Sequence, residues 1–224
     1  MLLAIDTATR MAGLALYDEK REWVVGEETW HSANNHTVEL MPRLVRLLEQ
    51  QGITPGGLTG IAVSQGPGSF TGLRIGLSVA KGLALASELP IAGIPTLDVV
   101  AEPHKSQALP ICALIQAGRG RFGVGHYVRQ RGRWTRRGPF RLATLSSLCE
   151  EMAEPTLFCG ELQAKDAEQI RRQHTPESLV ATPAASLRRA AYLAELGWAR
   201  LSRGSFDDPA QLSPIYLQHP QIDG

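Results

Sequence analysis

The sequence predicts an α/β fold built from two lobes, each a mixed sheet with helices packed on it. Three strand-like segments open each half of the chain, and alternating helix-like and strand-like segments follow them. That order is typical of a mixed sheet covered by helices. The length of 224 residues suits one domain or two small lobes and permits a sizeable core. We expect the first lobe to span residues 1–102 and a reduced second lobe to span residues 103–224.

The first half opens with a segment that is apolar for only five residues before Asp6 and Arg10 interrupt it. This segment is too short for a signal peptide or a membrane span, so it predicts a buried strand. The β-branched stretch at 60–64 predicts another buried strand, and the long apolar run after Gly72 predicts a helix. The expected elements are strands near 2–7, 12–18, 23–30, 59–64 and 91–94 and helices near 35–51 and 72–88.

The second half repeats the opening of the first, because segments 4–17 and 114–127 align at an offset of 110 residues. In both, an apolar strand reaches a polar residue, a short polar turn follows, and the next strand carries a glycine and then a tyrosine. Each of the two segments is therefore predicted to form a β-hairpin. The matched pairs are Asp6 and Gln116, Gly13 and Gly123, and Tyr17 and Tyr127. The expected elements are strands near 111–116, 122–129, 133–138, 156–159 and 178–181 and helices near 144–152, 163–173 and 184–203.

Composition excludes few function classes. The formal net charge is +1, with 43% hydrophobic and 20% charged residues, as in an ordinary soluble globular protein. Bulk charge alone therefore does not indicate nucleic-acid or membrane binding. Three cysteines, at 112, 149 and 159, show no paired metal spacing, and such a sparse, odd set indicates a reducing compartment.

The most distinctive motif is a glycine-rich run between the strand expected at 59–64 and the helix expected at 72–88. A strand, a tight loop and a helix that opens on Ser or Thr direct backbone N–H groups at one spot. Such a loop can cradle an anion, or it can hold the helix close to a sheet or to another protein. The loop residues are Gly66, Pro67, Gly68, Ser69, Phe70, Thr71 and Gly72.

The run at 66–76 resembles the signature of the TsaB family, also called YeaZ. The resemblance extends to residues 5–9 and 212–217 and covers most of the chain. It implies the two-lobed actin/Hsp70/sugar-kinase (ASKHA) fold and a cytoplasmic, non-catalytic subunit. Such a subunit binds and activates a TsaD-like protein that forms N6-threonylcarbamoyladenosine next to the tRNA anticodon. The resemblance also implies a TsaE-like ATPase as a further partner and no cofactor of the chain's own, with ATP or ADP binding only at the assembled complex.

Small side chains recur every four residues along the helix expected at 72–88 and form one ridge, which permits close approach of another helix. Ordinary packing inside the lobe also explains such a ridge. The resemblance implies instead that this helix and the one near 35–51 dock on the TsaD-like subunit and can self-associate as a homodimer. The candidate interface residues are Leu40, Leu44, Leu47, Leu73, Gly76, Leu77, Ala80, Leu83 and Ala84.

A nucleotide site is the first catalytic alternative. In the ASKHA superfamily, an Asp at the end of the first strand approaches nucleotide phosphates and magnesium, and here Asp6 and Thr7 hold that position. The same residues can simply end the strand and bond the turn N–H groups. The counterpart in the second half is Gln116, which is not a carboxylate, whereas the TsaB family usually has an Asp at the turn that follows. An ATP clamp uses groups from both lobes, so half of such a clamp is missing here. A small ATP-dependent kinase remains the alternative function.

A metallopeptidase is the second catalytic alternative. TsaD holds a metal with a His-x-x-x-His motif, and Thr96 and Val100 stand where its histidines would be. Neither residue supplies an imidazole. His31 and His36 are five residues apart, whereas ligands on one helix face are three or four apart, so we expect a solvated or capping role for both. The sequence therefore predicts no catalytic and no metal-binding residue.

The stretch from residue 103 to 149 contains no Asp or Glu but is rich in arginine. Arginine pairs well with phosphate, so one interpretation is a hairpin that holds a tRNA backbone indirectly or weakly. The other is a solvated hairpin, or a patch that pairs with acids elsewhere in the fold. The candidate tRNA contacts are Arg131, Arg133, Arg136 and Arg137.

Overall fold

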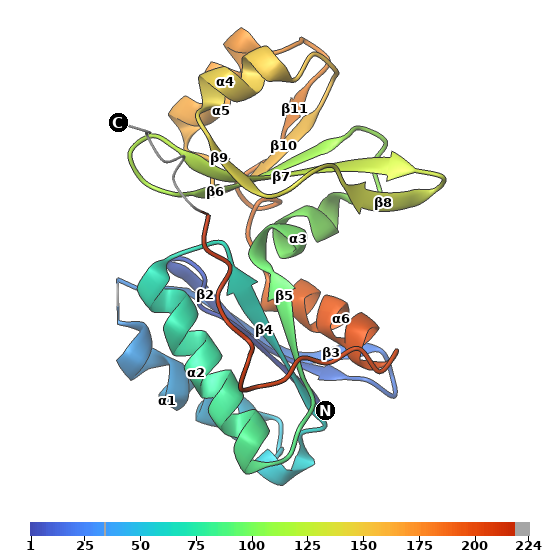
Figure 1. Cartoon of the computed structure of the whole chain (residues 1–224). Coiled ribbons are helices and arrows are strands. Elements are labelled where there is room, and N and C mark those ends of the chain that lie inside the picture. Colours follow the sequence, from blue (N-terminus) through green and yellow to red (C-terminus); the bar gives the residue numbers. More distant parts are fainter. Residues whose placement is uncertain (34, 218–224) are drawn as a thin grey trace. The chain divides into compact units, whose positions relative to one another are not determined.

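The computed structural model describes residues 1–33 and 35–217, and the chain divides into two compact units (Figure 1). Unit 1 comprises Met1–Val99 and Arg189–Ile215. Among the described residues, unit 2 comprises Val100–Arg188, Tyr216 and Leu217. The last part of the expected second lobe, residues 218–224, lies outside the described residues.

Among the described residues, unit 1 contains a five-stranded sheet. Its strands are β1 (Leu2–Asp6), β2 (Met11–Asp18), β3 (Trp23–His31), β4 (Gly60–Gly66) and β5 (Ile91–Pro95). The strand order is β3-β2-β1-β4-β5, with β2 antiparallel to both neighbours and β1, β4 and β5 parallel. The strands are mostly buried because helices cover both faces of the sheet.

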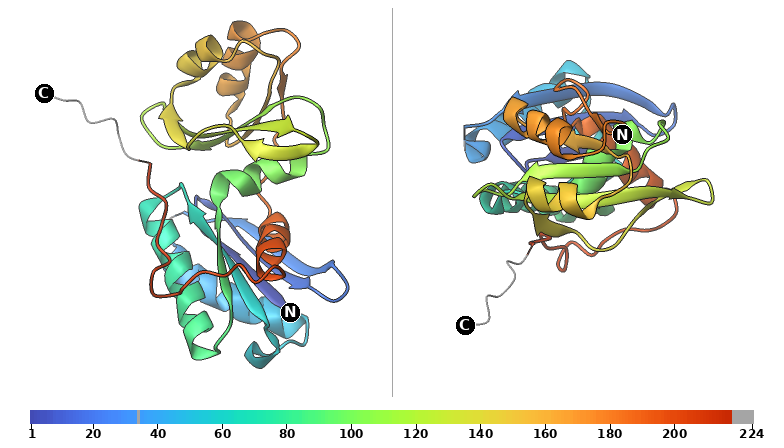
Figure 2. Two further views of the ribbon diagram at one scale, coloured as in Figure 1. Left: turned by 45° about the vertical axis from the view of Figure 1, so that its right-hand side comes forward. Right: turned by 90° about the horizontal axis from the view of Figure 1, so that it is seen from above.

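Two helices cover one face of this sheet and a third covers the other (Figure 2). They are α1 (His36–Gln50), α2 (Phe70–Ala86) and, on the opposite face, α6 (Ala190–Leu201). Short helical segments are η1 (Pro55–Gly57), between α1 and β4, and α3 (Thr96–Ala101) and η2 (Glu102–His104), which follow β5. No helix within the described part of the chain combines the length and apolar character that a membrane span needs.

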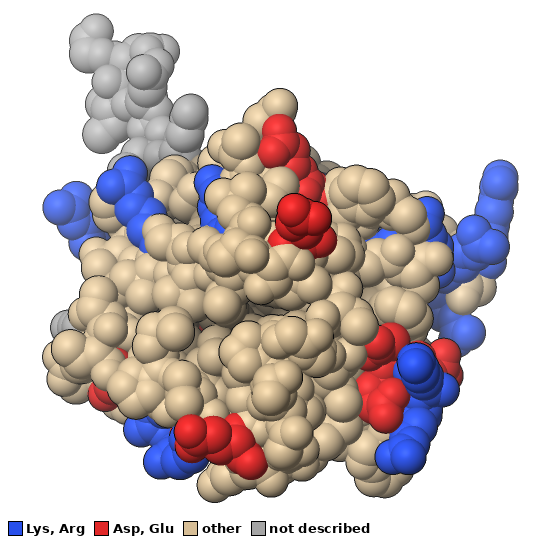
Figure 3. All heavy atoms as spheres, turned by 90° about the horizontal axis from the view of Figure 1, so that it is seen from below, with Lys and Arg blue, Asp and Glu red and all other residues tan. Residues whose placement is uncertain are grey.

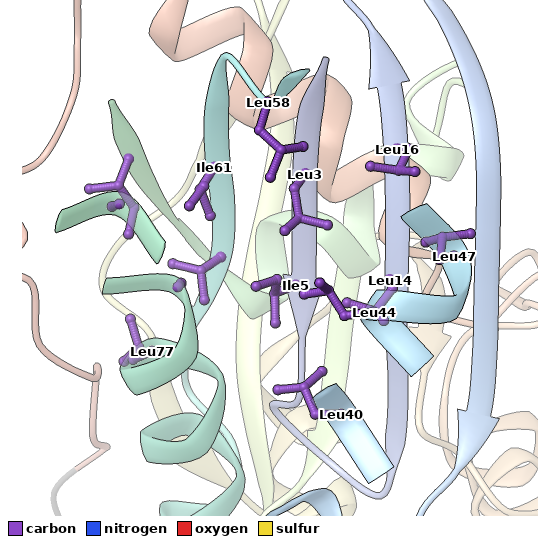
Figure 4. Packing of buried hydrophobic residues seen from close by; sticks show 14 of the residues in the cluster. Leu3, Ile5, Leu14, Leu16, Leu40, Leu44, Leu47, Leu58, Ile61 and Leu77 are labelled. Carbon is purple, nitrogen blue, oxygen red and sulfur yellow. The ribbon is translucent and has the colours of Figure 1, made fainter. Parts of the chain in front are cut away.

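The core beneath α1 and α2 explains why these segments are helical. In Figure 4, Leu40, Leu44 and Leu47 of α1 and Leu77 of α2 lie over the strands of the sheet. Their spacing of three or four residues places them on one side of each helix. The strand side chains beneath them are Leu3, Ile5, Leu14, Leu16 and Ile61.

Unit 2 repeats the topology of unit 1. Its described strands are β6 (Ile111–Gln116), β7 (Phe122–Gln130), β8 (Arg133–Arg136), β9 (Arg141–Ala143), β10 (Leu157–Gly160) and β11 (Leu179–Val180). The order β8-β7-β6-β10-β11 matches β3-β2-β1-β4-β5 strand for strand and direction for direction, and β9 adds to β7. The helices are α4 (Leu145–Glu151) and α5 (Ala164–Gln173).

The register of the two hairpins differs by one residue from the alignment at an offset of 110. Asp6 lies opposite Gly13, whereas Gln116 lies opposite Phe122 and Gly123 lies opposite Ile115. The repeated topology is therefore real, but the residue-for-residue match is not.

The helix expected at 184–203 in the second lobe begins only at residue 190 and packs in unit 1. Its buried Ala190, Leu193 and Ala194 pack with residues on the sheet face opposite α1 and α2. A Cβ on Gly197 would overlap Ala62, so the helix lies directly on β4. Assigning all of 103–224 to one lobe is wrong for this helix, because its apolar face fits the uncovered side of the first sheet. The sequence analysis also missed α3 and β9.

Candidate functional site

The glycine-rich run forms the junction between β4 and α2. Gly66 ends the strand with a φ of +108°, and a Cβ there would lie 2.6 Å from the carbonyl oxygen of Ile215. Ser69 caps α2, because its Oγ accepts a hydrogen bond from the Gly72 amide at 3.3 Å. The start of the helix is thus fixed at the end of the strand.

The first turns of α2 press against the turn between β1 and β2. The Ser69 amide donates to the carbonyl oxygen of Ala8 at 2.6 Å, and the Thr7 hydroxyl donates to that of Gly72 at 2.7 Å. A Cβ on Gly68, Gly72 or Gly76 would fall within 3.0 Å of Ala8 or Thr7, a separation that Cβ atoms do not adopt. The glycine spacing therefore holds the helix against the sheet, and the Ser69 and Gly72 amides already have partners.

The two candidate nucleotide residues serve the same junction. Asp6 is 2% exposed, and its Oδ1 accepts from the Ala8 amide and from the Ser64 hydroxyl, each at 2.9 Å. Thr7 is buried and bonded to α2. Both residues end the strand and bond its turn, which is the structural alternative to phosphate binding.

The candidate interface residues are mostly buried within unit 1 itself. Leu83 is half-buried, and the others lie in the core or against the β1–β2 turn. The exposed apolar residues of α1 are Val38 (68% exposed), Met41 (40%) and Val45 (45%). Their spacing of three and four residues forms a second apolar stripe, and the sequence analysis missed it because the leucine stripe is stronger.

The positions that correspond to the TsaD metal motif lie one turn apart on α3. Thr96 and Val100 are both buried, and Thr96 Oγ1 has no hydrogen-bond partner among the described residues. Nowhere in the described part of the chain do three His, Cys, Asp or Glu side chains gather in a way that could hold a metal ion.

The comparisons with known proteins decide the family. The family model described as "TsaD: tRNA N6-adenosine threonylcarbamoyltransferase" matches residues 28–136. The tRNA threonylcarbamoyladenosine biosynthesis protein TsaB of Bacillus subtilis is 31% identical over 199 residues, which cover 88% of this chain and 86% of that protein. The chain belongs to the TsaB family.

Two further relatives extend the TsaB match over nearly the whole chain. TsaB of Haemophilus influenzae is 27% identical over 226 residues, 97% of this chain and 93% of that protein. The crystallographic relative YeaZ from Pseudomonas aeruginosa superposes with a TM-score of 0.80 at 25% identity, covering 96% of this chain and 99% of that one. The ASKHA fold expected from the sequence is confirmed.

Burial shifts the pKa values of two cysteines and of His36 in this TsaB-family chain. All three cysteines are free thiols, and burial raises the pKa of Cys112 to about 12 and that of Cys159 well above its ordinary value. The thiolate, which is the nucleophile, is therefore suppressed. His36 is buried rather than solvated, and burial lowers its pKa.

The arginines of the acid-free stretch fall into two groups. Arg137 pairs with Glu154 at 3.1 Å and Arg141 pairs with Glu151, so the interpretation as a patch paired with distant acids holds for these two. Arg136 stacks 4.0 Å from the ring centroid of Phe140. Arg131 and Arg133 are exposed at the tip of the β7–β8 hairpin.

Proposed function

We propose that the chain is a non-catalytic subunit that binds and activates a TsaD-like protein. That partner transfers threonylcarbamoyl onto the adenosine next to the tRNA anticodon. Membership of the TsaB family supports this role, since its curated members are named as threonylcarbamoyladenosine biosynthesis proteins. In this proposal the chain is cytoplasmic and needs no cofactor of its own. ATP or ADP binds at the assembled complex, and a TsaE-like ATPase joins it.

The engagement of Asp6 and Thr7 is the observation that carries the non-catalytic assignment. In a working ATP site the carboxylate would face the magnesium ion, whereas Asp6 here accepts from Ala8 and Ser64. Thr7 donates to Gly72 in the same buried junction. The kinase alternative is therefore not favoured. The metallopeptidase alternative is not favoured either, because Thr96 and Val100 offer no imidazole.

We place the partner surface on the exposed side of α1 and the neighbouring side of α2. Val38, Met41 and Val45 offer apolar contact area there, and Ile75 and Val79 of α2 are half-buried. The TsaD family model matches residues 28–136, which include both helices. A TsaD-like partner thus has a related helix pair, and packing two such pairs buries apolar stripes from both proteins. The same surface serves a homodimer when the partner is absent.

The test is light scattering after size exclusion on the chain mixed with the TsaD-like protein of the same organism. The double variant Met41→Glu/Val45→Glu places two carboxylates in the proposed contact and should weaken the heterodimer about 100-fold or more. The control Trp23→Glu changes a more exposed apolar residue, in β3, and should leave the heterodimer intact. A folded Met41→Glu/Val45→Glu chain that still binds with wild-type affinity would show that the surface is misplaced.

A further inference from the structure

The β7–β8 hairpin of unit 2 ends in a two-residue turn that carries an arginine in an unusual conformation. Gln130 pairs with Arg133, and the two residues between them, Arg131 and Gly132, have φ values of +50° and +80°. Such turns favour Asn-Gly, because an ordinary side chain is strained at positive φ. Glu22 in the unit 1 hairpin has a similar φ of +52°, so the conformation belongs to the turn, and the distinctive feature of the unit 2 hairpin is the arginine that occupies it.

The hairpin tip is strongly basic. Arg129, Arg131 and Arg133 are exposed, and none of the three forms an ion pair within residues 1–33 and 35–217. Arg129 pairs across the hairpin with Trp134, and Gln130 pairs with Arg133. Because paired residues share a face and successive residues alternate, the cations point from both faces and from the tip. Figure 1 shows the hairpin extending beyond the other strands of its sheet.

The corresponding hairpin of unit 1 shows that the fold does not require this charge. Glu19, Lys20, Arg21 and Glu22 lie between β2 and β3 and carry both signs, and Arg21 pairs with Asp18 at the end of β2. The face drawn in Figure 3 likewise carries both signs around an uncharged centre. The exposed arginines without ion pairs thus distinguish the unit 2 hairpin from its unit 1 counterpart.

We infer that the β7–β8 hairpin is an RNA-contacting element whose arginines bind backbone phosphates of the tRNA that is modified. This inference rests on the proposed function, which makes tRNA the substrate of the assembled complex. Arginine binds phosphate through several N–H donors, and phosphate contacts dominate affinity for nucleic acid. A protein partner is disfavoured because the centre of a protein interface is usually apolar or aromatic, and the hairpin tip exposes no such side chain. The aromatic residue here, Trp134, is half-buried and donates to the Lys105 carbonyl oxygen at 2.6 Å.

The experiment measures binding of an unmodified tRNA transcript to the full chain and to its mixture with the TsaD-like protein, as a function of salt. The test variant is Arg129→Gln/Arg131→Gln/Arg133→Gln. The matched control is Lys20→Gln/Arg21→Gln in the unit 1 hairpin. A third variant, Arg129→Lys/Arg131→Lys/Arg133→Lys, keeps the charge. The slope of log affinity against log salt should fall by about 2 to 3 in the glutamine variant, at about 0.7 to 0.9 per phosphate contact, and stay unchanged in the other two.

Three other outcomes would each overturn the inference. Wild-type tRNA affinity and slope in the glutamine variant would show that the hairpin does not touch RNA. Loss of the heterodimer in the glutamine variant would show a protein contact instead. Equal competition by double-stranded DNA of the same length would show a general polyanion patch. If the wild-type chain forms no heterodimer, the proposed function fails, and the RNA inference is still decided by the slopes of the chain alone.

Discussion

The two units share one strand topology but treat the turn after their first strand in opposite ways. In unit 1 the β1–β2 turn is covered by α2 and its glycines, and Asp6 is buried beneath it. In unit 2 the turn after β6 is open: Gly118 and Gly120 have nothing within 4 Å of an added Cβ. A pocket of about 480 Å³ adjoins that turn, and Arg119 is among the residues that line it.

The difference originates in the helix that follows β4 in unit 1 and β10 in unit 2. In unit 1, α2 begins with the Ser69 cap directly against the turn. In unit 2, the residue after β10 is Glu161, whose carboxylate accepts from the Gln116 amide at 3.2 Å, and α5 starts only at Ala164. The glycine-rich motif therefore lets α2 cover the β1–β2 turn of unit 1, whereas the corresponding turn of unit 2 stays open.

The largest expected effect comes from adding one methyl group at this closure. Gly72→Ala places a Cβ against the Thr7 carbonyl oxygen, which is backbone and cannot move away, so the free energy of unfolding should drop by about 3 kcal/mol or more. Gly82→Ala, on the exposed side of the same helix with nothing within 4 Å, should raise it by about 0.5 to 1 kcal/mol. Urea unfolding of both variants measures the contrast.

The matching substitution in unit 2 is at the open turn after β6. Gly118 has a φ of +77° and free space around it, so Gly118→Ala should cost only about 1 to 2 kcal/mol, from conformation alone. If Gly72→Ala were no worse than Gly118→Ala, the two turns would not differ in packing as described, and the closure account would be wrong.

A smaller effect concerns pH. Burial lowers the pKa of His36, which lies next to the closed turn, although the negative charges of Glu39 and Asp6 act to raise it. A histidine that is harder to protonate when folded binds fewer protons than in the unfolded chain, so stability is lost as pH falls from the ordinary pKa near 6.5 through the lowered one. Each unit of pKa difference is worth about 1.4 kcal/mol.

His36→Gln should therefore reduce the loss of unfolding free energy between pH 7 and pH 5. Burial lowers the pKa of His126 in unit 2 as well, so His126→Gln should remove a separate share of the same loss. Urea unfolding at both pH values gives the comparison. An unchanged difference in His36→Gln would mean that His36 titrates normally in the folded chain.

The sequence predicted the strand succession of both units and the strand–loop–helix at the glycine run, because local periodicity and turn residues specify these features. It did not place α6 in unit 1, since that contact joins residues far apart in the sequence, such as Gly197 and Ala62. It named Leu40, Leu44 and Leu47 of α1 as partner contacts, whereas the structure buries them in the core of unit 1, because a leucine stripe gives the same signal whether it faces a core or a partner. The acidic partners of Arg137 and Arg141 lie beyond the acid-free stretch, so only the fold could pair them.

The measurement that tests the central claim most directly is the rate of threonylcarbamoyl transfer from its adenylate to tRNA. The TsaD-like protein of the same organism is held constant while this chain is titrated into it. The account predicts no transfer by this chain alone, and a rate that rises and saturates at one chain per TsaD-like protein. Transfer by this chain alone, or a TsaD-like rate that does not respond to it, would contradict the account.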